Sequence, residues 1–176
     1  MKVAVITGGS SGIGKAICTL FLQKGMSVVC LDLNKNPEVH LSLILDIGNQ
    51  DQVMNAKNQI LTLFHKIDIW INNAGISHIG NVEKTSPEEL DRIYNTNIKG
   101  VYNGCLAAVS VMKDQNFGVI LNMGSIAADV GLSDRFAYSM SKGAVHSMTY
   151  SIAKDYLQYN IRCNAIAPAR VHTPFV

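Results

Sequence analysis

Short, nearly continuous apolar runs alternate with segments of helical periodicity along the chain, and no other feature constrains the fold as strongly. Such runs are typical of strands buried on both faces, and a helix between two strands is the connection that parallel pairing requires. The sequence therefore predicts an α/β domain, a doubly wound parallel sheet of at least six strands with helices on both faces. The expected strands are residues 2–7, 26–32, 41–46, 67–75, 117–125 and 161–168, and the expected helical segments are residues 14–25, 50–66, 86–113 and 138–158. The segment 86–113 is expected to form one or two helices.

Local signals mark two helix ends. Ser86 as N-cap, Pro87 at the first helical position and Glu89 three residues after Ser86 predict a capping box at the start of the third helical segment. Gly25 follows the first helical segment and suits its C-terminal cap.

The charge balance and the N-terminus exclude several functions. The 15 Lys and Arg residues stand against 13 Asp and Glu residues, without the basic runs or interleaved aromatic residues that nucleic-acid binding needs. The apolar run after Lys2 is too short for a signal-peptide core, and none approaches the roughly 20 residues that span a bilayer. We therefore expect a cytoplasmic protein that binds neither nucleic acid nor membrane.

The cysteines and histidines do not form a ligand pattern. Cys18, Cys30, Cys105 and Cys163 are scattered through apolar segments without the spacing of metal ligands, and the five histidines are equally dispersed. We expect four buried, reduced thiols and no metal site.

A glycine cluster, TGGSSGIG at residues 7–14, lies between the first predicted strand and the first predicted helix. Gly8, Gly12 and Gly14 there allow a tight turn and close approach of the backbone, while the N–H groups and dipole of the helix favour a pyrophosphate. An ordinary turn would contain the same residues. The place between strand and helix is what favours a dinucleotide site.

Asp32 ends the second predicted strand, after the glycine cluster. A carboxylate there can accept hydrogen bonds from both hydroxyls of an adenosine ribose, whereas a 2′-phosphate would bring negative charge against it. The sequence therefore predicts NAD in preference to NADP, with Lys15 and Lys35 as the nearby bases that could soften the preference. An acid that starts a turn is the alternative.

Tyr138 and Lys142, in the stretch RFAYSMSKGAVHS, stand four positions apart and are therefore neighbours on one helix face. An ammonium within about 4–6 Å stabilises a phenolate and lowers the phenol pKa from about 10. Hydride transfer to or from a carbonyl carbon needs such a general acid/base at the oxygen. A packed tyrosine beside a solvated lysine would show the same spacing, so the pair does not decide the function by itself.

Five motifs follow one another along the chain, namely Thr7-Gly8-x-x-x-Gly12-x-Gly14, Asn72-Asn73-Ala74-Gly75, Asn97 in NTNIKG, Ser125 in NMGSIAA, and Tyr138-x-x-x-Lys142. In these motifs the chain, from Lys2 to about Pro174, resembles the short-chain dehydrogenase/reductase family of the common short type. The resemblance implies a Rossmann fold, a nicotinamide cofactor, an alcohol or carbonyl substrate, and a homo-oligomer, a tetramer or dimer, built through residues 86–113 and 138–159.

The resemblance also implies the residues of the site. Tyr138 is the implied acid/base tuned by Lys142, Ser125 would orient the substrate oxygen, and Asn97 would hold a water that connects the lysine to solvent. The implied cofactor-binding residues are Gly8, Ser10, Ser11, Gly12, Ile13, Gly14, Asp32, Asp46, Ile47, Asn73, Ala74, Gly75, Tyr138, Lys142, Val171 and Thr173. Asp46 could instead cap the following helix, and Val171 could be an apolar strand end.

Two features depart from the family pattern. Ala169 stands where the family has a glycine after proline, so the loop there can differ in conformation. The chain stops at Val176, and we expect a single NAD-binding domain, residues 1–176, without the usual C-terminal strand and substrate-covering helices.

The leading hypothesis is an NAD-dependent oxidoreductase that acts on a secondary alcohol or carbonyl. The alternative is a cofactor-binding but non-catalytic protein, a truncated product or a regulator. A mononucleotide or flavin site is a third reading, although the glycine cluster lacks the order of a P-loop. Arg170 and His172, near the expected mouth of the site, favour a small polar substrate such as a sugar, but a solvated loop end would explain both.

Overall fold

The computed structural model describes residues 1–173, so the end of the predicted resemblance at Pro174 lies outside the described residues. The strands are β1 (Val3–Thr7), β2 (Ser27–Asp32), β3 (Leu41–Ile44), β4 (Ile69–Asn72), β5 (Gly118–Met123) and β6 (Ile161–Ile166). The α-helices are α1 (Gly12–Gln23), α2 (Gln50–Phe64), α3 (Pro87–Ile93), α4 (Gly100–Gln115) and α5 (Phe136–Asp155). A π-helical turn, η1 (Tyr94–Lys99), joins α3 to α4, and two 3-10 turns are η2 (Ile126–Ala128) and η3 (Leu157–Tyr159).

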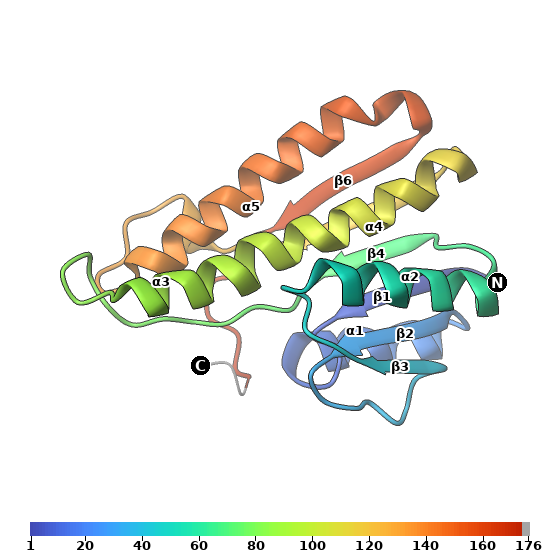
Figure 1. The fold of residues 1–176 in the computed structure, drawn as a ribbon, viewed down its shortest axis with the longest axis horizontal. Coiled ribbons are helices and arrows are strands. Elements are labelled where there is room, and N and C mark those ends of the chain that lie inside the picture. The colour runs from blue at the N-terminus through green and yellow to red at the C-terminus, as the bar shows by residue number, and fades with distance from the viewer. Residues whose placement is uncertain (174–176) are drawn as a thin grey trace.

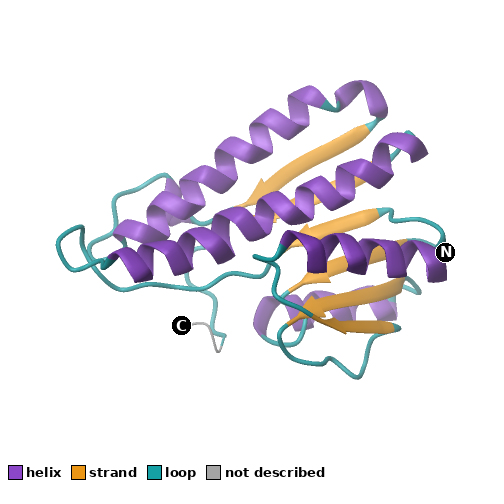
Figure 2. Ribbon diagram, viewed as in Figure 1, coloured by secondary structure: helices purple, strands orange, loops and turns teal. Residues whose placement is uncertain are grey.

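The strands form one parallel sheet in the order β3-β2-β1-β4-β5-β6. This order confirms the predicted doubly wound Rossmann fold, and it reverses direction between β1 and β4. Figure 2 shows the strands as one layer between helices. In such a sheet, ligands bind outside the carboxyl ends of the strands where the order reverses. The glycine loop, which follows β1, lies at that place.

The two faces of the sheet are covered unequally. Helices α2, α4 and α5 pack on one face through the larger apolar core, and α1 packs on the opposite face, behind the sheet in Figure 1. Along β6 the residues alternate, with Ile161 and Cys163 buried and Arg162 and Asn164 exposed. Helices on both faces are therefore confirmed, but within residues 1–173 the second face of β6 is open to solvent.

The predicted helix ends are confirmed, and the third helical segment differs from its expected form. Ser86 and Glu89 form the reciprocal capping box, and Gly25 adopts a φ of 70° just after α1. The segment predicted as one or two helices contains the π turn η1, whose widened backbone holds Asn97 fully buried. π turns are frequent at functional sites and have no simple sequence signature.

A row of buried side-chain hydrogen bonds crosses the sheet and reaches α5. The indole nitrogen of Trp70 donates to Asn72 over 2.8 Å, and Asn72 donates to Asn122 over 2.8 Å. Asn122 then donates to the Thr149 hydroxyl over 2.9 Å, and that hydroxyl donates to the Val145 carbonyl. Because these groups are shielded from water, leaving one unpaired would cost about 1–3 kcal/mol, so the row holds α5 at one position on the sheet.

All four cysteines are buried and free of disulfide bonds, as predicted. Among the described residues, no helix is both long and apolar enough to cross a membrane.

Gly14, the last residue of the glycine cluster and part of the first turn of α1, should tolerate no side chain. A Cβ on Gly14 would overlap the Gly8 carbonyl oxygen and the Asn73 amide, so we expect Gly14→Ala to lower the free energy of unfolding by about 1–3 kcal/mol. Gly143→Ala is the matched control, because nothing lies within 4 Å of its added Cβ. That change should stabilise helix α5 by about 0.5–1 kcal/mol. Urea unfolding of both variants measures the difference, and equal effects would contradict the packing argument.

Candidate active site

The glycine loop is tied to the end of β4 by Thr7 and Asn73. The Thr7 hydroxyl accepts hydrogen bonds from the backbone N–H groups of Asn73 and Ala74, each over 3.0 Å. The Asn73 side chain donates back to the carbonyls of Thr7 and Gly8 over 3.0 Å. Gly8 adopts a φ of 66°, a conformation that favours glycine. These bonds hold the start of the glycine loop against the segment that follows β4.

Asp32, at the carboxyl end of β2, faces the same loop. Its carboxylate accepts hydrogen bonds from the N–H groups of Ser10 and Asn34, each over 3.0 Å. The Asn36 side chain, which is buried, donates to the Gly9 carbonyl over 2.8 Å. The chain after β2 thus packs against the glycine loop and places a carboxylate beside it.

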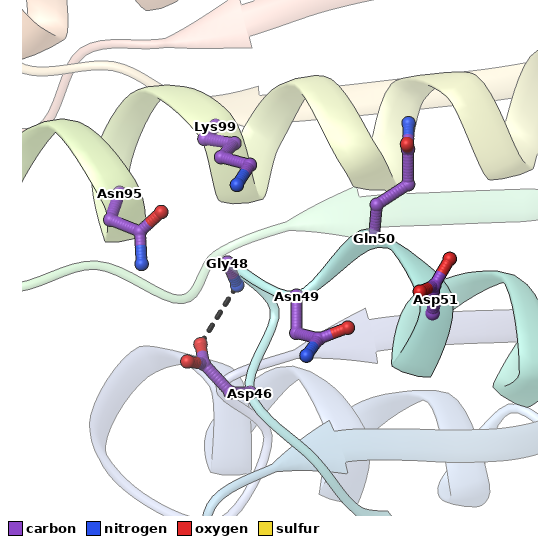
Figure 3. Close-up of a pocket in the computed structure, with 7 residues that line it drawn as sticks. All are labelled: Asp46, Gly48, Asn49, Gln50, Asp51, Asn95 and Lys99. Carbon is purple, nitrogen blue, oxygen red and sulfur yellow. Dashed lines mark hydrogen bonds between the residues drawn. The ribbon is translucent and has the colours of Figure 1, made fainter.

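Asp46 and Ile47 lie after β3, at the edge of a polar pocket. Asp46 accepts a hydrogen bond from the Gly48 N–H over 2.8 Å and does not cap α2, whose N-cap is Asn49. Ile47 is buried, and its carbonyl accepts a hydrogen bond from Asn103 of α4 over 2.8 Å. Figure 3 shows the pocket, which is lined by Asp46, Gly48, Asn49, Gln50, Asp51, Asn95 and Lys99.

Asn97 connects three parts of the candidate site. Its side chain accepts a hydrogen bond from the Ile76 N–H over 2.8 Å and donates to the Ile76 carbonyl over 2.9 Å. It also donates to the Ser141 hydroxyl over 3.0 Å, and this hydroxyl donates to the Tyr138 carbonyl over 2.7 Å. Asn97 thereby joins the segment after β4 to the first turns of α5.

Lys142 is buried beside Tyr138. Its ammonium donates to the Met123 carbonyl over 2.7 Å and lies 5.8 Å from the centre of the Tyr138 ring. Burial lowers the pKa of Lys142 from 10.5 to about 8 because the charged form loses hydration. Only 4% of Lys142 is exposed, so it is not the solvated lysine of an ordinary amphipathic helix.

Ser125 lies just beyond β5 and is buried. It is the N-cap of η2, and its hydroxyl accepts a hydrogen bond from the Ala127 N–H over 3.1 Å. The sequence placed it at the end of the strand, whereas the structure places it in the turn that follows. A hydroxyl has further hydrogen-bonding capacity after accepting one bond.

The remaining predicted residues lie around the loop and after β6. Ser11 is the N-cap of α1, and Ile13 lies in its first turn. Val171 and Thr173 lie beyond β6 outside regular secondary structure, and Val171 is exposed. Their contact with a nicotinamide stays a prediction.

The motifs did not assign roles to Ser141, Asn36 or the Met123 carbonyl, although each fixes part of this geometry. Ser141 directly precedes Lys142 and lies inside the Tyr138-x-x-x-Lys142 motif, so the sequence shows where it stands but not what it contacts. Its bond to Asn97 joins residues far apart in the sequence, and only the packing of η1 against α5 creates it.

A family model described as short chain dehydrogenase matches residues 2–176. The chain belongs to the short-chain dehydrogenase family. The 2-(R)-hydroxypropyl-CoM dehydrogenase of Xanthobacter autotrophicus is 38% identical to it over 189 residues, an alignment that covers 98% of this chain and 76% of that relative. The protein is thus a member of an oxidoreductase family.

Solved short-chain dehydrogenase structures resemble it closely. The 3-ketoacyl-(acyl-carrier-protein) reductase from Brucella melitensis, complexed with NADH, has a TM-score of 0.94 at 34% identity and covers 99% of this chain and 77% of that one. ElxO with NADP bound has a TM-score of 0.93 at 30% identity and covers 98% of this chain and 75% of that one. The family binds nicotinamide cofactors, and these two structures hold different ones.

The residues of this short-chain dehydrogenase fit such a dinucleotide. Ser11 makes no side-chain hydrogen bond to the first turn of α1, and that turn contains no acid, so its N–H groups are available to a phosphate. The missing side chain of Gly75 leaves space beside the active-site groups, because a Cβ there would lie 3.3 Å from the Asn97 oxygen and 3.6 Å from the Lys142 nitrogen.

Stability should depend on pH through Lys142. Its pKa is about 8 in the folded protein and 10.5 ordinarily, so between these values the unfolded chain binds more protons and the free energy of unfolding rises with pH. From pH 7 to pH 10, the wild-type protein should gain about 2 kcal/mol relative to Lys142→Met, since one pH unit corresponds to about 1.4 kcal/mol. Urea unfolding of both proteins across this range measures the gain. A difference that does not vary with pH would contradict it.

Proposed function

We propose that this chain is an NAD(H)-dependent oxidoreductase that transfers a hydride between nicotinamide and a secondary alcohol or its ketone. The observation that supports it most is the buried Lys142, held by the Met123 carbonyl with its nitrogen 5.8 Å from the Tyr138 ring. Within residues 1–173 no ion pair of Lys142 is found, and burying an unpaired cation is unfavourable for stability, so a functional use accounts for its presence better than packing does.

Tyr138 is the proposed general acid/base. When bound, the nicotinamide supplies or accepts the hydride. Tyr138 would give a proton to the substrate oxygen in reduction and take it in oxidation. The Lys142 ammonium favours the phenolate form electrostatically, and at neutral pH it keeps its proton because its pKa is about 8.

Ser125 and Asn97 take supporting roles in the proposal. The Ser125 hydroxyl would hold the substrate oxygen and orient it toward Tyr138. Asn97 keeps η1 and the chain after β4 together, beside Gly75 and Lys142. The relay water that the family resemblance implies would lie at this place.

The proposal includes a preference for NAD over NADP. The Asp32 carboxylate lies against the glycine loop, where it can accept hydrogen bonds from ribose hydroxyls and would repel a 2′-phosphate. Lys15, one of the two nearby bases, is paired with Glu38 over 3.0 Å. That ion pair reduces the help that Lys15 could give to a phosphate.

Substrate and assembly are parts of the same proposal. The name of the Xanthobacter relative denotes a secondary alcohol, which supports this substrate class here. Arg170 and His172 are exposed beyond β6, so the sugar preference stays a prediction, as does the cytoplasmic location. A homo-oligomer would cover the exposed aromatic residues of α4 and α5, Tyr102 and Tyr150.

The dinucleotide preference can be tested at Asp32. The wild-type protein should bind NADH at least about tenfold more tightly than NADPH, since hydrogen bonds to a charged group contribute about 1.5–3 kcal/mol. Asp32→Asn keeps an acceptor but removes the charge, so the ratio of the two dissociation constants should fall toward one. Nicotinamide fluorescence measures both constants, with Asp51→Asn as the control. Equal wild-type affinities would contradict the preference.

Tyr138→Phe should leave NADH affinity nearly unchanged and lower turnover by at least about 100-fold, the contribution typical of general acid–base catalysis. Tyr150→Phe, an exposed tyrosine on the same helix, is the matched control and should keep full turnover. Turnover is measured with a panel of secondary alcohols and their ketones. Near-normal turnover of Tyr138→Phe would contradict the acid/base role. A wild-type chain that binds NADH but turns over no panel member would favour the non-catalytic alternative.

A further inference from the structure

Two cysteines meet beneath the glycine loop. Cys18 of α1 and Cys30 of β2 are 1% and 0% exposed. A Cβ on Gly9 would lie 2.9 Å from the sulfur of each, so both sulfurs lie directly under the backbone at residue 9. Glycine at residue 9 leaves room for the two sulfurs, because an added Cβ would overlap both.

The two thiols are not equivalent. A hydrogen bond between them lowers the pKa of Cys18 and raises that of Cys30, while burial and then the charges of Asp32 and Glu38 oppose the change at Cys18. Of the two sulfurs, Cys18 is therefore the one that loses its proton more easily, and the Cys30 thiol lies beside it. A thiolate next to a second thiol is the arrangement from which disulfides form.

The other two cysteines form a natural comparison. Cys105 donates to the Asn122 side-chain oxygen over 3.7 Å, and the Asn122 side chain donates to the Cys163 sulfur over 3.6 Å. Burial raises the pKa of each to about 12, which keeps both protonated. Burial alone thus does not favour a reactive thiol, and the contact between Cys18 and Cys30 distinguishes their pair.

We propose that Cys18 and Cys30 form an oxidisable dithiol site, which a hydroperoxide converts into a disulfide and a bound dinucleotide shields. The shielding, unlike the disulfide, rests on the proposed dinucleotide function. The Cys18 thiolate attacks the peroxide, breaks its O–O bond and becomes a sulfenic acid, while the leaving oxygen takes a proton as an alcohol or water. The Cys30 thiol then attacks the Cys18 sulfur, the S–S bond forms, and the sulfenic oxygen leaves as water. The peroxide is reduced by two electrons, which the two thiols supply.

The backbone at Gly9 lies directly over the two sulfurs, and this contact is the basis of the proposed shielding. The backbone around Gly9 is held by the Asn36 amide over 2.8 Å and by the bond from Ser10 to Asp32 over 3.0 Å. A peroxide reaches the sulfurs only when this loop opens locally. A dinucleotide that binds the closed loop makes the opening rarer by mass action. By reciprocity, a disulfide that alters the loop changes dinucleotide affinity by the same factor.

The test treats the full chain with hydrogen peroxide and maps its cysteines by peptide mass spectrometry over time. We expect a Cys18–Cys30 disulfide before any oxidation of Cys105 or Cys163. In Cys30→Ser, dimedone should trap a sulfenic acid at Cys18, and in Cys18→Ala, Cys30 should stay reduced. Cys105→Ala is the matched control and should form the disulfide at the wild-type rate. Circular dichroism before treatment shows that each variant is folded.

The same reaction in saturating NADH tests the shielding, and nicotinamide fluorescence reports binding separately. NADH should lower the rate of disulfide formation by about tenfold or more. Earlier oxidation of Cys105 or Cys163, or no Cys18–Cys30 disulfide in the folded chain, would overturn the dithiol site. NADH that binds without slowing the reaction would overturn the shielding. A disulfide in a chain that binds no NADH would support the dithiol site while counting against the proposed function.

Discussion

The row of buried hydrogen bonds that ends at Thr149 determines where helix α5 lies on the sheet, and the candidate active site depends on that position. Asn122 of β5 is paired on one side with Asn72 of β4 and on the other with Thr149. A polar row inside an apolar core is satisfied in one arrangement only, because any slip would leave buried donors or acceptors unpaired. The position of α5 therefore fixes where Tyr138 and Lys142 lie relative to the carboxyl end of β5.

Lys142 is stable in its buried place because several neighbours are arranged around it. The Met123 carbonyl at the end of β5 accepts a hydrogen bond from its ammonium, and the Asn97 side chain, like the ammonium, lies beside Gly75. Burial removes the hydration of the cation and thereby lowers its pKa. The buried cation lowers the free energy of unfolding, and such a cost is common at sites where a protein binds or transforms a ligand.

The glycine loop shows a second use of close packing. Hydrogen bonds between Thr7 and Asn73 fix the start of the loop, and the sulfurs of Cys18 and Cys30 pack against Gly9. Because glycine at residue 9 leaves room for the two sulfurs, the segment proposed to bind the dinucleotide also packs directly on the pair of thiols. The sequence motifs predict the dinucleotide site but contain no sign of the contact with the thiols.

The sequence by itself determined the parallel sheet, the place of the glycine loop, the capping box at Ser86 and the membership of Tyr138 and Lys142 in one helix face, because periodicity and local turn chemistry act over a few residues. It did not predict the π turn that buries Asn97, the turn capped by Ser125, or the open face of β6. Those features depend on which segments pack together. The burial of Lys142, its contact with the Met123 carbonyl and the meeting of the thiols under the loop were decided only by tertiary structure, since each joins groups that are separated along the chain and come together only when the helices pack on the sheet.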